Sequence, residues 1–267
     1  MGAMKIRDRS SIVTLWRRTV LTVVSFYLLL PLIAMLDFST KVGRHMRGLY
    51  AWKAIIHQPD LISAIVTSLE LAIIVVGLVL FLVVPTVVWV HLKLPKLRRL
   101  LELVCLLPLA IPGIVLVVGV ADVYRWISIH ITESPLTLSA VYAMLVLPYT
   151  YRSLSAALNA VDVHTLAEAS RTLGASTFRM LFGVVVPTIR AGVMSGAVIS
   201  IALVLGEYTI SSLLNYKTMQ VQIVLLGQSD ASIAVAVSLA SLIFVFLLLV
   251  IIPTTTSRAI EVLDTDE

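Results

Sequence analysis

The chain has 267 residues, of which 59% are hydrophobic and only 13% charged, and its formal net charge is +5. Soluble globular domains carry about 25% charged residues, so this composition excludes an ordinary water-soluble domain. The positive charge does not indicate a nucleic-acid partner, because the Lys and Arg residues lie at the ends of apolar blocks and form no basic face. The single cysteine, Cys105, lies inside an apolar block, which excludes an intrachain disulfide and a cysteine cluster for a metal.

Six long apolar blocks follow one another along the chain. A helix needs about 20 apolar residues to cross a bilayer core of about 30 Å. Because the blocks are continuous and do not alternate with period two, they predict helices and not the strands of a barrel. The expected fold is an all-α polytopic membrane protein whose six transmembrane helices form a single domain over 19–253. The predicted spans are 19–38, 61–90, 100–122, 137–157, 188–208 and 231–253.

The first block follows Arg17 and Arg18, as the apolar region of a signal peptide would. Its length and the five blocks after it favour a retained first helix instead. An even number of spans places both ends of the chain, 1–18 and 254–267, on one side of the membrane.

The distribution of positive charge indicates which side that is. Cytoplasmic segments of membrane proteins carry an excess of Lys and Arg. Of the 20 Lys and Arg residues, 14 fall on the side of the termini, so both termini are predicted to be cytoplasmic. The first external loop departs from this rule, and its apolar part from Leu49 to Ile56 predicts an ordered segment. The six residues on the external side are Lys41, Arg44, Arg47, Lys53, Arg125 and Lys217.

The loop from about 158 to 187 is too polar to span the membrane and too apolar to be a flexible linker. Thr165 and Glu168 have the spacing of a capping box at the start of a helix. Gly174 follows at a position typical of the left-handed residue after a helix. Ser176 can cap a second short helix, and Pro187 follows where the next span begins. The loop therefore predicts a helix, a turn and a helix on the cytoplasmic face.

The same loop carries a longer pattern. Glu168-Ala169-Ser170 is followed after three residues by Gly174, and after nine more by Val184-Val185-Val186-Pro187. This resembles the EAA loop of the permease subunits of type I ABC importers. The spacing agrees throughout, while Ser170 stands where the motif has its second alanine, and valines stand for isoleucine and leucine.

The resemblance implies that this loop is the coupling element, whose short helix inserts into a groove of a separate ATPase subunit. The ATPase would bind ATP and Mg, and this chain would bind no cofactor. For Glu168, capping of the helix and contact with the partner remain equally open. The residues expected to take part in coupling are Thr165, Glu168, Ala169, Ser170, Gly174, Ala175 and Pro187.

Two further stretches resemble permeases for polyamines, iron, molybdate and aminophosphonates. They are Thr67 to Ala72 in the second block and Leu107 to Val115 in the third. With the loop, the similarity covers roughly 67–253. It implies a subunit in the plasma membrane of a prokaryote, surrounded by lipid and paired with a second permease to complete one pathway. The second permease is expected to be a different chain, although a homodimer stays open.

Several residues inside the spans are candidates for the pathway. Pro108 and Pro112 each remove a backbone donor and predict a kink, which is either part of a gate or pathway wall or a static bend. Glu207 and Glu70 are ionisable groups within spans, where such groups mark either a pathway or a structural pair. Two acidic groups on a pathway would suit a cationic solute, such as a polyamine or a ferric ion.

The sequence contains no phosphate-binding loop of the Gly-x-x-x-x-Gly-Lys-Ser/Thr type, so nucleotide chemistry is expected from another polypeptide and not from this chain. An external solute-binding protein, which the resemblance implies, would dock on the loops around 40–60 and 209–230. Two other functions remain open. One is a secondary transporter driven by an ion gradient, which predicts repeated halves, and the other is a membrane enzyme with catalytic groups gathered at one face.

Overall fold

The computed structural model describes residues 3–42 and 46–264, with side chains described for 14–41 and 48–251. The described chain is almost entirely helical, which confirms the expected all-α class. It divides into two compact units, one of Met1–His57 with Leu226–Ala240 and one of Gln58–Leu225 with Ser241–Glu267. The expectation of a single domain over 19–253 stays a prediction.

The first unit begins with the long helix α1 (Ala3–Ser39), whose side chains from Leu15 to Leu36 are largely exposed. Apolar side chains of a membrane span can be exposed on the surface of the chain, because lipid surrounds them. Two-residue strands β1 (Lys41–Val42) and β2 (Met46–Arg47) then pair antiparallel. The short helix α2 (Tyr50–Ile55) confirms the ordered segment expected there. Residues 43–45 of this loop lie outside the described residues.

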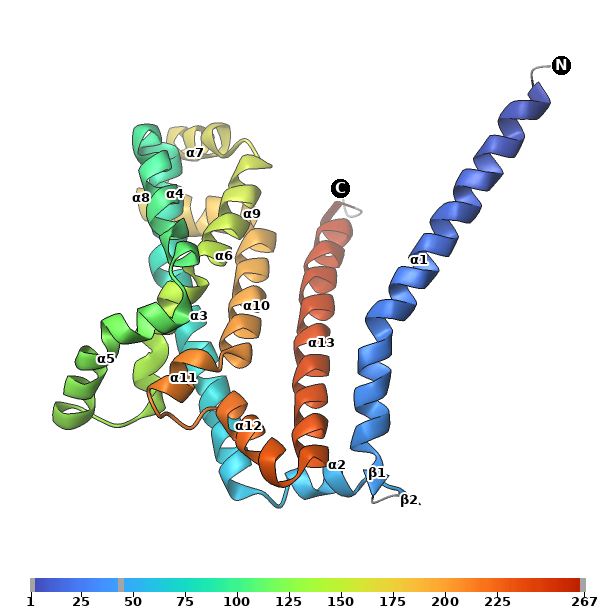
Figure 1. Ribbon diagram of the computed structural model, residues 1–267. Coiled ribbons are helices and arrows are strands. Elements are labelled where there is room, and N and C mark those ends of the chain that lie inside the picture. Colours follow the sequence, from blue (N-terminus) through green and yellow to red (C-terminus); the bar gives the residue numbers. More distant parts are fainter. Residues whose placement is uncertain (1–2, 43–45, 265–267) are drawn as a thin grey trace. The chain divides into compact units, whose positions relative to one another are not determined.

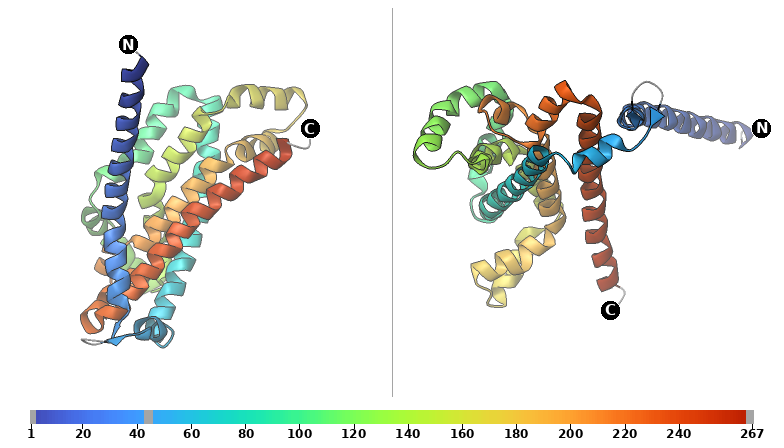
Figure 2. Two further views of the ribbon diagram at one scale, coloured as in Figure 1. Left: turned by 90° about the vertical axis from the view of Figure 1, so that its right-hand side faces the viewer. Right: turned by 90° about the horizontal axis from the view of Figure 1, so that it is seen from below.

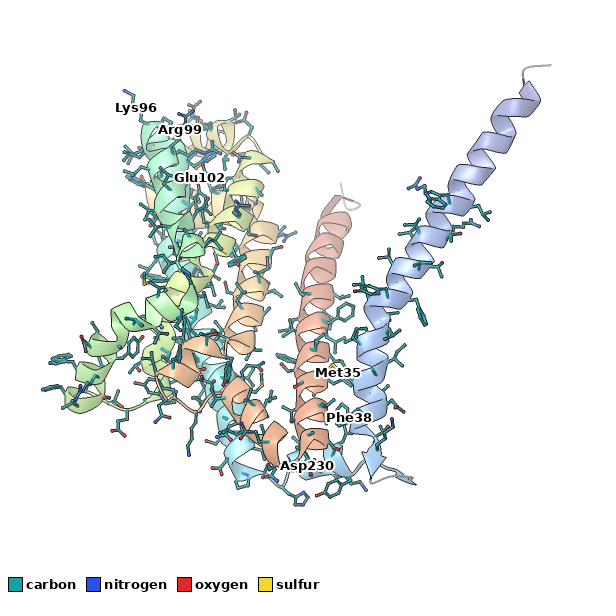
Figure 3. All side chains as sticks on the ribbon, viewed as in Figure 1. Met35, Phe38, Lys96, Arg99, Glu102 and Asp230 are labelled. Carbon is teal, nitrogen blue, oxygen red and sulfur yellow. The ribbon has the colours of Figure 1, made fainter. Side chains whose placement is uncertain are left out.

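Polar side chains fix the ends of helices in the first unit. Trp52 on α2 donates from its indole Nε1 to Ser39 Oγ at 3.2 Å, which ties α2 to the end of α1. The helix α13 (Ala231–Asp264) starts at Asp230, whose Oδ1 accepts from two backbone N–H groups of its first turn. Figure 3 labels Met35 and Phe38 on α1 and Asp230 before α13. The Asp230 cap satisfies backbone N–H groups that the start of a helix leaves without partners.

The second unit holds most of the remaining helices (Figure 1). Its long elements are α3 (Pro59–Lys93), α5 (Gly113–His130), α6 (Ser139–Asn159) and α10 (Arg190–Gly206). Its shorter ones, in chain order, are η1 (Pro95–Leu97), α4 (Arg98–Leu106), η2 (Leu107–Ala110), η3 (Pro135–Leu138), α7 (Val163–Thr172), α8 (Thr177–Met180), the π-helix η4 (Leu181–Val185), α9 (Val186–Thr188) and α11 (Thr209–Leu213). Helix α12 (Met219–Ser229) is divided between the two units after Leu225.

The core of the second unit lies where α6 packs against both α3 and α10. Small residues allow α6 and α10 to approach closely. A Cβ atom built on Gly192 would lie 2.4 Å from Ala157 Cβ, and one on Gly196 would lie 3.2 Å from Thr150 Cγ2. Glycines spaced by four residues are typical of tightly packed transmembrane helices. This helix pair is therefore held by van der Waals packing of backbone on backbone.

Within the described residues, five helices are long and apolar enough to cross a membrane. They are Thr14–Ser39, Pro59–Lys93, Gly113–His130, Arg190–Leu213 and Ala231–Ile251. The predicted span 137–157 corresponds to α6, which is not among them because Tyr, Thr, Ser and Arg interrupt its apolar sequence. Helix α6 is covered by its own neighbours and can carry these polar groups. The count of six spans stays a prediction.

The predicted span 100–122 is interrupted where Pro108 and Pro112 predicted a kink, and the interruption is larger than a kink. The chain forms α4 and the 3-10 turn η2, extends at Ile111 and Pro112, and restarts as α5 at Gly113. Pro108 and Pro112 remove backbone donors from consecutive turns, so the two together interrupt the helix completely. The fifth span continues past its predicted end in the short helix α11, and α13 extends to Asp264.

Candidate functional site

The loop between α6 and α10 forms an elbow at one end of the second unit. Figures 1 and 2 show α7 running across the direction of α3, α6 and α10 instead of along it. The root of the elbow is fixed by Arg98 at the start of α4, whose Nη2 donates to Asn159 Oδ1 at the end of α6 (2.5 Å). The predicted helix, turn and helix are confirmed in their order along the chain, and their cytoplasmic side stays a prediction.

The start of α7 differs from the prediction. Its cap is Asp162, which accepts from Thr165 N at 3.2 Å and from Thr165 Oγ1 at 2.7 Å. These hydrogen bonds favour the charged form and hold the pKa of the Asp162 carboxyl below its ordinary value. The capping box assigned to Thr165 and Glu168 was wrong, because the aspartate three residues earlier is the better acceptor. Glu168 therefore does not cap the start of α7.

The end of α7 has the geometry expected from Gly174. This glycine has φ +82°, a left-handed conformation that costs other residues energy. Ala175 N donates to Ser170 O at 3.1 Å and Gly174 N donates to Arg171 O at 2.9 Å. This is the Schellman pattern, which satisfies the last carbonyls of a helix. It turns the chain sharply into α8, whose start is capped by Ser176 as predicted.

The two faces of α7 have different surroundings. Val163, Ala167 and Ser170 are buried, and their spacing places them on one face against the second unit. The opposite face is exposed, and Leu173 at its end is 88% exposed. The exposed members of the predicted coupling set are Thr165, Glu168, Ala169, Gly174 and Pro187, while Ser170 is buried and Ala175 half-buried.

Charged side chains gather at the end of the second unit where α7 lies. Lys96 on η1 lies there together with Arg99 and Glu102 on α4 (Figure 3). The rings of His91 on α3 and His164 on α7 lie 6.0 Å apart between centroids. The elbow thus has a predominantly basic border, as the predicted topology requires of a cytoplasmic end.

Two interruptions of the helices meet at the other end of α10. Helix α10 stops at Gly206, residue 207 is extended, and α11 starts at Thr209. A Cβ built on Gly113, just after the Pro112 break, would lie 3.8 Å from Thr209 Cγ2. The structure therefore places the break predicted at Pro112 beside a second break after Gly206, which the sequence did not predict. Pro108 is buried in η2, which packs against α6.

Glu207 makes three hydrogen bonds through its two carboxylate oxygens. Tyr142 on α6 donates its hydroxyl to Oε2 at 2.5 Å. The backbone N–H groups of Ile210 and Ser211 donate to Oε1 and Oε2 at 2.7 and 3.3 Å. The carboxylate thus caps α11 and anchors it to α6. These three hydrogen bonds occupy most of the positions at which the two carboxylate oxygens can accept. Glu207 can therefore make few contacts with a solute cation.

Glu70 has different surroundings. Its side chain is exposed on α3 and has no ion pair or hydrogen bond with the described residues. Two residues earlier, the hydroxyl of the buried Ser68 accepts from Met219 N at 2.8 Å, where α12 begins. An exposed carboxylate within a span is costly against lipid, so it faces water or another chain. Among the described residues, Glu70 and Glu207 share no contact.

Sequence analysis missed the residues that hold α11 and α12 in place. Gln220 donates to Leu205 O at 2.9 Å, at the end of α10. Thr218 and Ser211 share a buried hydrogen bond of 2.9 Å between their hydroxyls. Buried polar groups of this kind are hydrogen-bonded to partners distant in sequence. The one feature of the sequence that could have indicated these contacts is the number of Ser, Thr and Gln residues in 209–222. A segment that faces lipid would contain fewer.

The helical bundle, its interrupted spans and its crosswise elbow define a class, the membrane-spanning permease of an importer. A family profile described as "Binding-protein-dependent transport system inner membrane component" matches residues 78–260. The chain belongs to this family. The resemblance to type I ABC importer permeases drawn from the sequence is confirmed.

Two curated relatives are both named "Molybdenum transport system permease protein ModB", from Escherichia coli strain K12 and from Escherichia coli O157:H7. Each is 32% identical over 122 residues, which cover 42% of this chain and 53% of the relative. The chain thus spans about half the length of these relatives in the match.

A solved structure has a similar fold. It is titled "Crystal structure of a bacterial ABC transporter involved in the import of the acidic polysaccharide alginate". The TM-score is 0.62 at 13% identity, over 90% of this chain and 94% of the other. At that identity the likeness concerns the fold alone.

Proposed function

We propose that this chain is a transmembrane permease subunit of an ABC importer, which forms half of the solute pathway and is moved by a separate ATPase. The observation that carries this proposal is α7, a short capped helix across the end of the second unit with Glu168, Ala169 and Leu173 exposed. A surface helix with an uncovered apolar residue at its end fits a groove in a partner. The family match supports the same assignment.

Movement of α7 reaches the pathway through continuous helices. Helix α7 is joined through α8, η4 and α9 to α10, and α10 leads to the break at Glu207. On the other side α7 follows α6, which carries Tyr142, the hydroxyl partner of Glu207. Both helices that leave the elbow thus end at one carboxylate. A displacement of α7 by the ATPase would be transmitted along rigid helices to that carboxylate.

The candidate pathway comprises the two meeting breaks and the exposed carboxylate of Glu70. Interrupted helices near one another are typical of solute sites in transporters. In this assignment Pro108 and Pro112 maintain the break in the wall, and Glu207 holds α11 beside it. The pathway is completed by a second permease, and an external solute-binding protein docks on the segments around 40–60 and 209–230, which contain α2, α11 and α12. In this orientation both termini lie in the cytoplasm.

The candidate solutes fall into two chemical classes, a small oxyanion and a cation. The curated relatives are named as molybdenum transport permeases, which favours a small oxyanion. The acidic Glu70 and Glu207 favour a cation such as a polyamine or a ferric ion, but the hydrogen bonds of Glu207 weaken that argument. We therefore propose molybdate or a similar oxyanion first. A thermal-shift screen of the assembled complex with its binding protein, using molybdate, tungstate, spermidine and ferric citrate, would decide between the two.

The experiment that tests coupling is co-purification with an ATPase, followed by assay of solute-stimulated ATP hydrolysis in liposomes. Glu168→Ala and Gly174→Asp are expected to lower assembly or to abolish stimulation. Intact assembly and intact stimulation in both variants would show that the elbow is not the coupling element. An ion-gradient-driven transporter would instead accumulate solute without any ATPase.

A further inference from the structure

The inner side of the elbow contains a hollow of about 520 Å³, which we call the elbow hollow. It is lined by apolar side chains of Leu166, Leu173 and Val184, by Ser170 on α7, and by Gly183 on η4. A Cβ built on Gly183 would meet only Arg179 Cγ at 3.8 Å, so the glycine leaves this space open. The size falls in the range of sites that take a ligand or a large side chain.

Ser170 is the unusual member of this lining. The side chain is buried, with 7% of the residue exposed, yet its Oγ has no hydrogen-bond partner. Among the described residues, no other buried side-chain nitrogen or oxygen lacks a partner. A buried hydroxyl without a partner is unfavourable, and each such group requires an explanation. The Oγ atom itself has almost no exposed area, so it meets a group in the elbow hollow only when the side chain rotates about its single torsion.

Arg179 supplies a charge at the same place. It lines the elbow hollow from α8, is exposed, and forms no ion pair with any residue whose side chain the structure describes. A guanidinium group beside an apolar recess selects a carboxylate on the incoming surface, because the pair can form two parallel hydrogen bonds. The elbow hollow therefore combines apolar walls, one unpartnered hydroxyl and one cation.

We propose that the elbow hollow receives one tyrosine side chain of the ATPase subunit, and that an acidic residue beside that tyrosine pairs with Arg179. The inference rests on the proposed function, since it names the group that the ATPase presents. A tyrosine ring matches the apolar walls, and its hydroxyl, which needs a partner when buried, meets that of Ser170. The coupling contact is then reciprocal, with α7 seated in the ATPase and a tyrosine of the ATPase seated in the elbow.

Binding measurements on the assembled permease in nanodiscs test the fit, with the co-purifying ATPase subunit as titrant. Gly183→Leu fills the elbow hollow and is expected to weaken binding by at least about tenfold. Ser170→Ala is expected to weaken it by roughly fivefold to thirtyfold, while the melting temperature of the permease alone stays unchanged or rises. Gly77→Leu, in open space on α3, is the matched control and keeps normal binding. Unchanged binding by Gly183→Leu would overturn the proposal.

Photo-cross-linking identifies the occupant and separates this inference from the proposed function. Benzoylphenylalanine placed at Val184 is expected to capture an ATPase peptide that contains a tyrosine and a neighbouring Asp or Glu. The same probe at Glu168 reports contact of α7 with the ATPase. Capture at Glu168 together with lipid, a second permease or nothing at Val184 would overturn the inference alone. Capture of no ATPase at either position would overturn the proposed function as well.

Discussion

Ser153 on α6 donates its hydroxyl to the backbone carbonyl of Gly192 on α10 at 2.8 Å, and the two helices touch at this point. A Cβ on Gly192 would lie 2.4 Å from Ala157 Cβ and 2.9 Å from Ser153 O. Helix α6 leads into α7, and the segments after α7 lead back into α10. This contact therefore holds together the two helices that leave the elbow, close to their junction with it.

Gly192→Ala is expected to destabilise the protein by about 1–3 kcal/mol, because overpacking forces the helices apart. Alanine ordinarily stabilises a helix relative to glycine, so the sign of the change is diagnostic. The free energy of unfolding in mixed detergent measures it. The control is Gly119→Ala on α5, where a Cβ meets nothing within 4 Å and stability is expected to hold or rise. Equal behaviour of the two variants would contradict the close approach.

Tyr142→Phe is expected to cost about 1.5–3 kcal/mol, because it removes a hydrogen bond to a charged carboxylate. Helix α11 would lose its anchor to α6 and exchange its amide hydrogens faster. Hydrogen exchange over 207–213, together with thermal unfolding, provides the measurement. Tyr149→Phe lies on the same helix, and its exposed hydroxyl has no hydrogen bond with the described residues, so this control should change neither quantity.

Gly174→Ala is expected to cost about 1–2 kcal/mol locally, because alanine is strained at φ +82°. The turn after α7 would loosen, and solute-stimulated ATP hydrolysis would fall while the α6–α10 core stays folded. Gly174→Asn should cost less, since asparagine tolerates the left-handed conformation. Loss of activity in both variants to the same extent would indicate that the glycine is needed for contact and not for the turn.

The cap at Asp162 predicts a pH dependence of α7. Hydrogen bonds from Thr165 lower the pKa of this carboxyl below its ordinary value of 3.8. Its contribution is therefore present above that value and is lost as the pH falls through the lowered pKa. We expect α7 to keep its order from pH 7 down to the ordinary carboxyl range and to fray only below it. Hydrogen exchange of 163–167 follows this, and Asp162→Ala should show the frayed state already at pH 7.

Glu70 allows a test of the pathway. In a Cys105→Ala background, Glu70→Cys is expected to react with a membrane-impermeant charged thiol reagent in the assembled importer, because a residue of the proposed pathway is in contact with water. Leu82→Cys, an exposed apolar position on α3 that lies about 120° round the helix from Glu70, serves as the control and should react slowly. Equal and slow reaction at both positions would place Glu70 against lipid or a partner and remove it from the pathway.

The sequence was informative where structure is determined locally. The elbow could be predicted because its helix ends depend on residues close in sequence. Ser176 caps α8, and Gly174 turns the chain after α7. The start of α7 was assigned to the wrong residue because two capping signals overlap, and Asp162 competes with Thr165 for the same N–H groups.

Distant contacts were beyond sequence reasoning. The break at Glu207 depends on Tyr142, 65 residues earlier, and no local pattern marks that partner. Helix α6 can carry polar residues because α3 and α10 pack against it. The composition of α6 alone does not show that these helices are its neighbours. The extent of the break at Pro112 was underestimated for a related reason, since Thr209 lies against the restart of the helix.

The hydrogen bond from Met219 N to Ser68 Oγ also bears on biosynthesis, because it joins residues 151 positions apart. Ribosomes add about 5–20 residues per second, so roughly 8–30 s separate the synthesis of the two partners. Until Met219 is synthesised, the serine hydroxyl lacks the N–H donor with which it is paired in the folded chain. Docking of α12 is consequently a late event of membrane insertion, and nascent chains truncated before Met219 should be the preferred substrates of quality-control proteases.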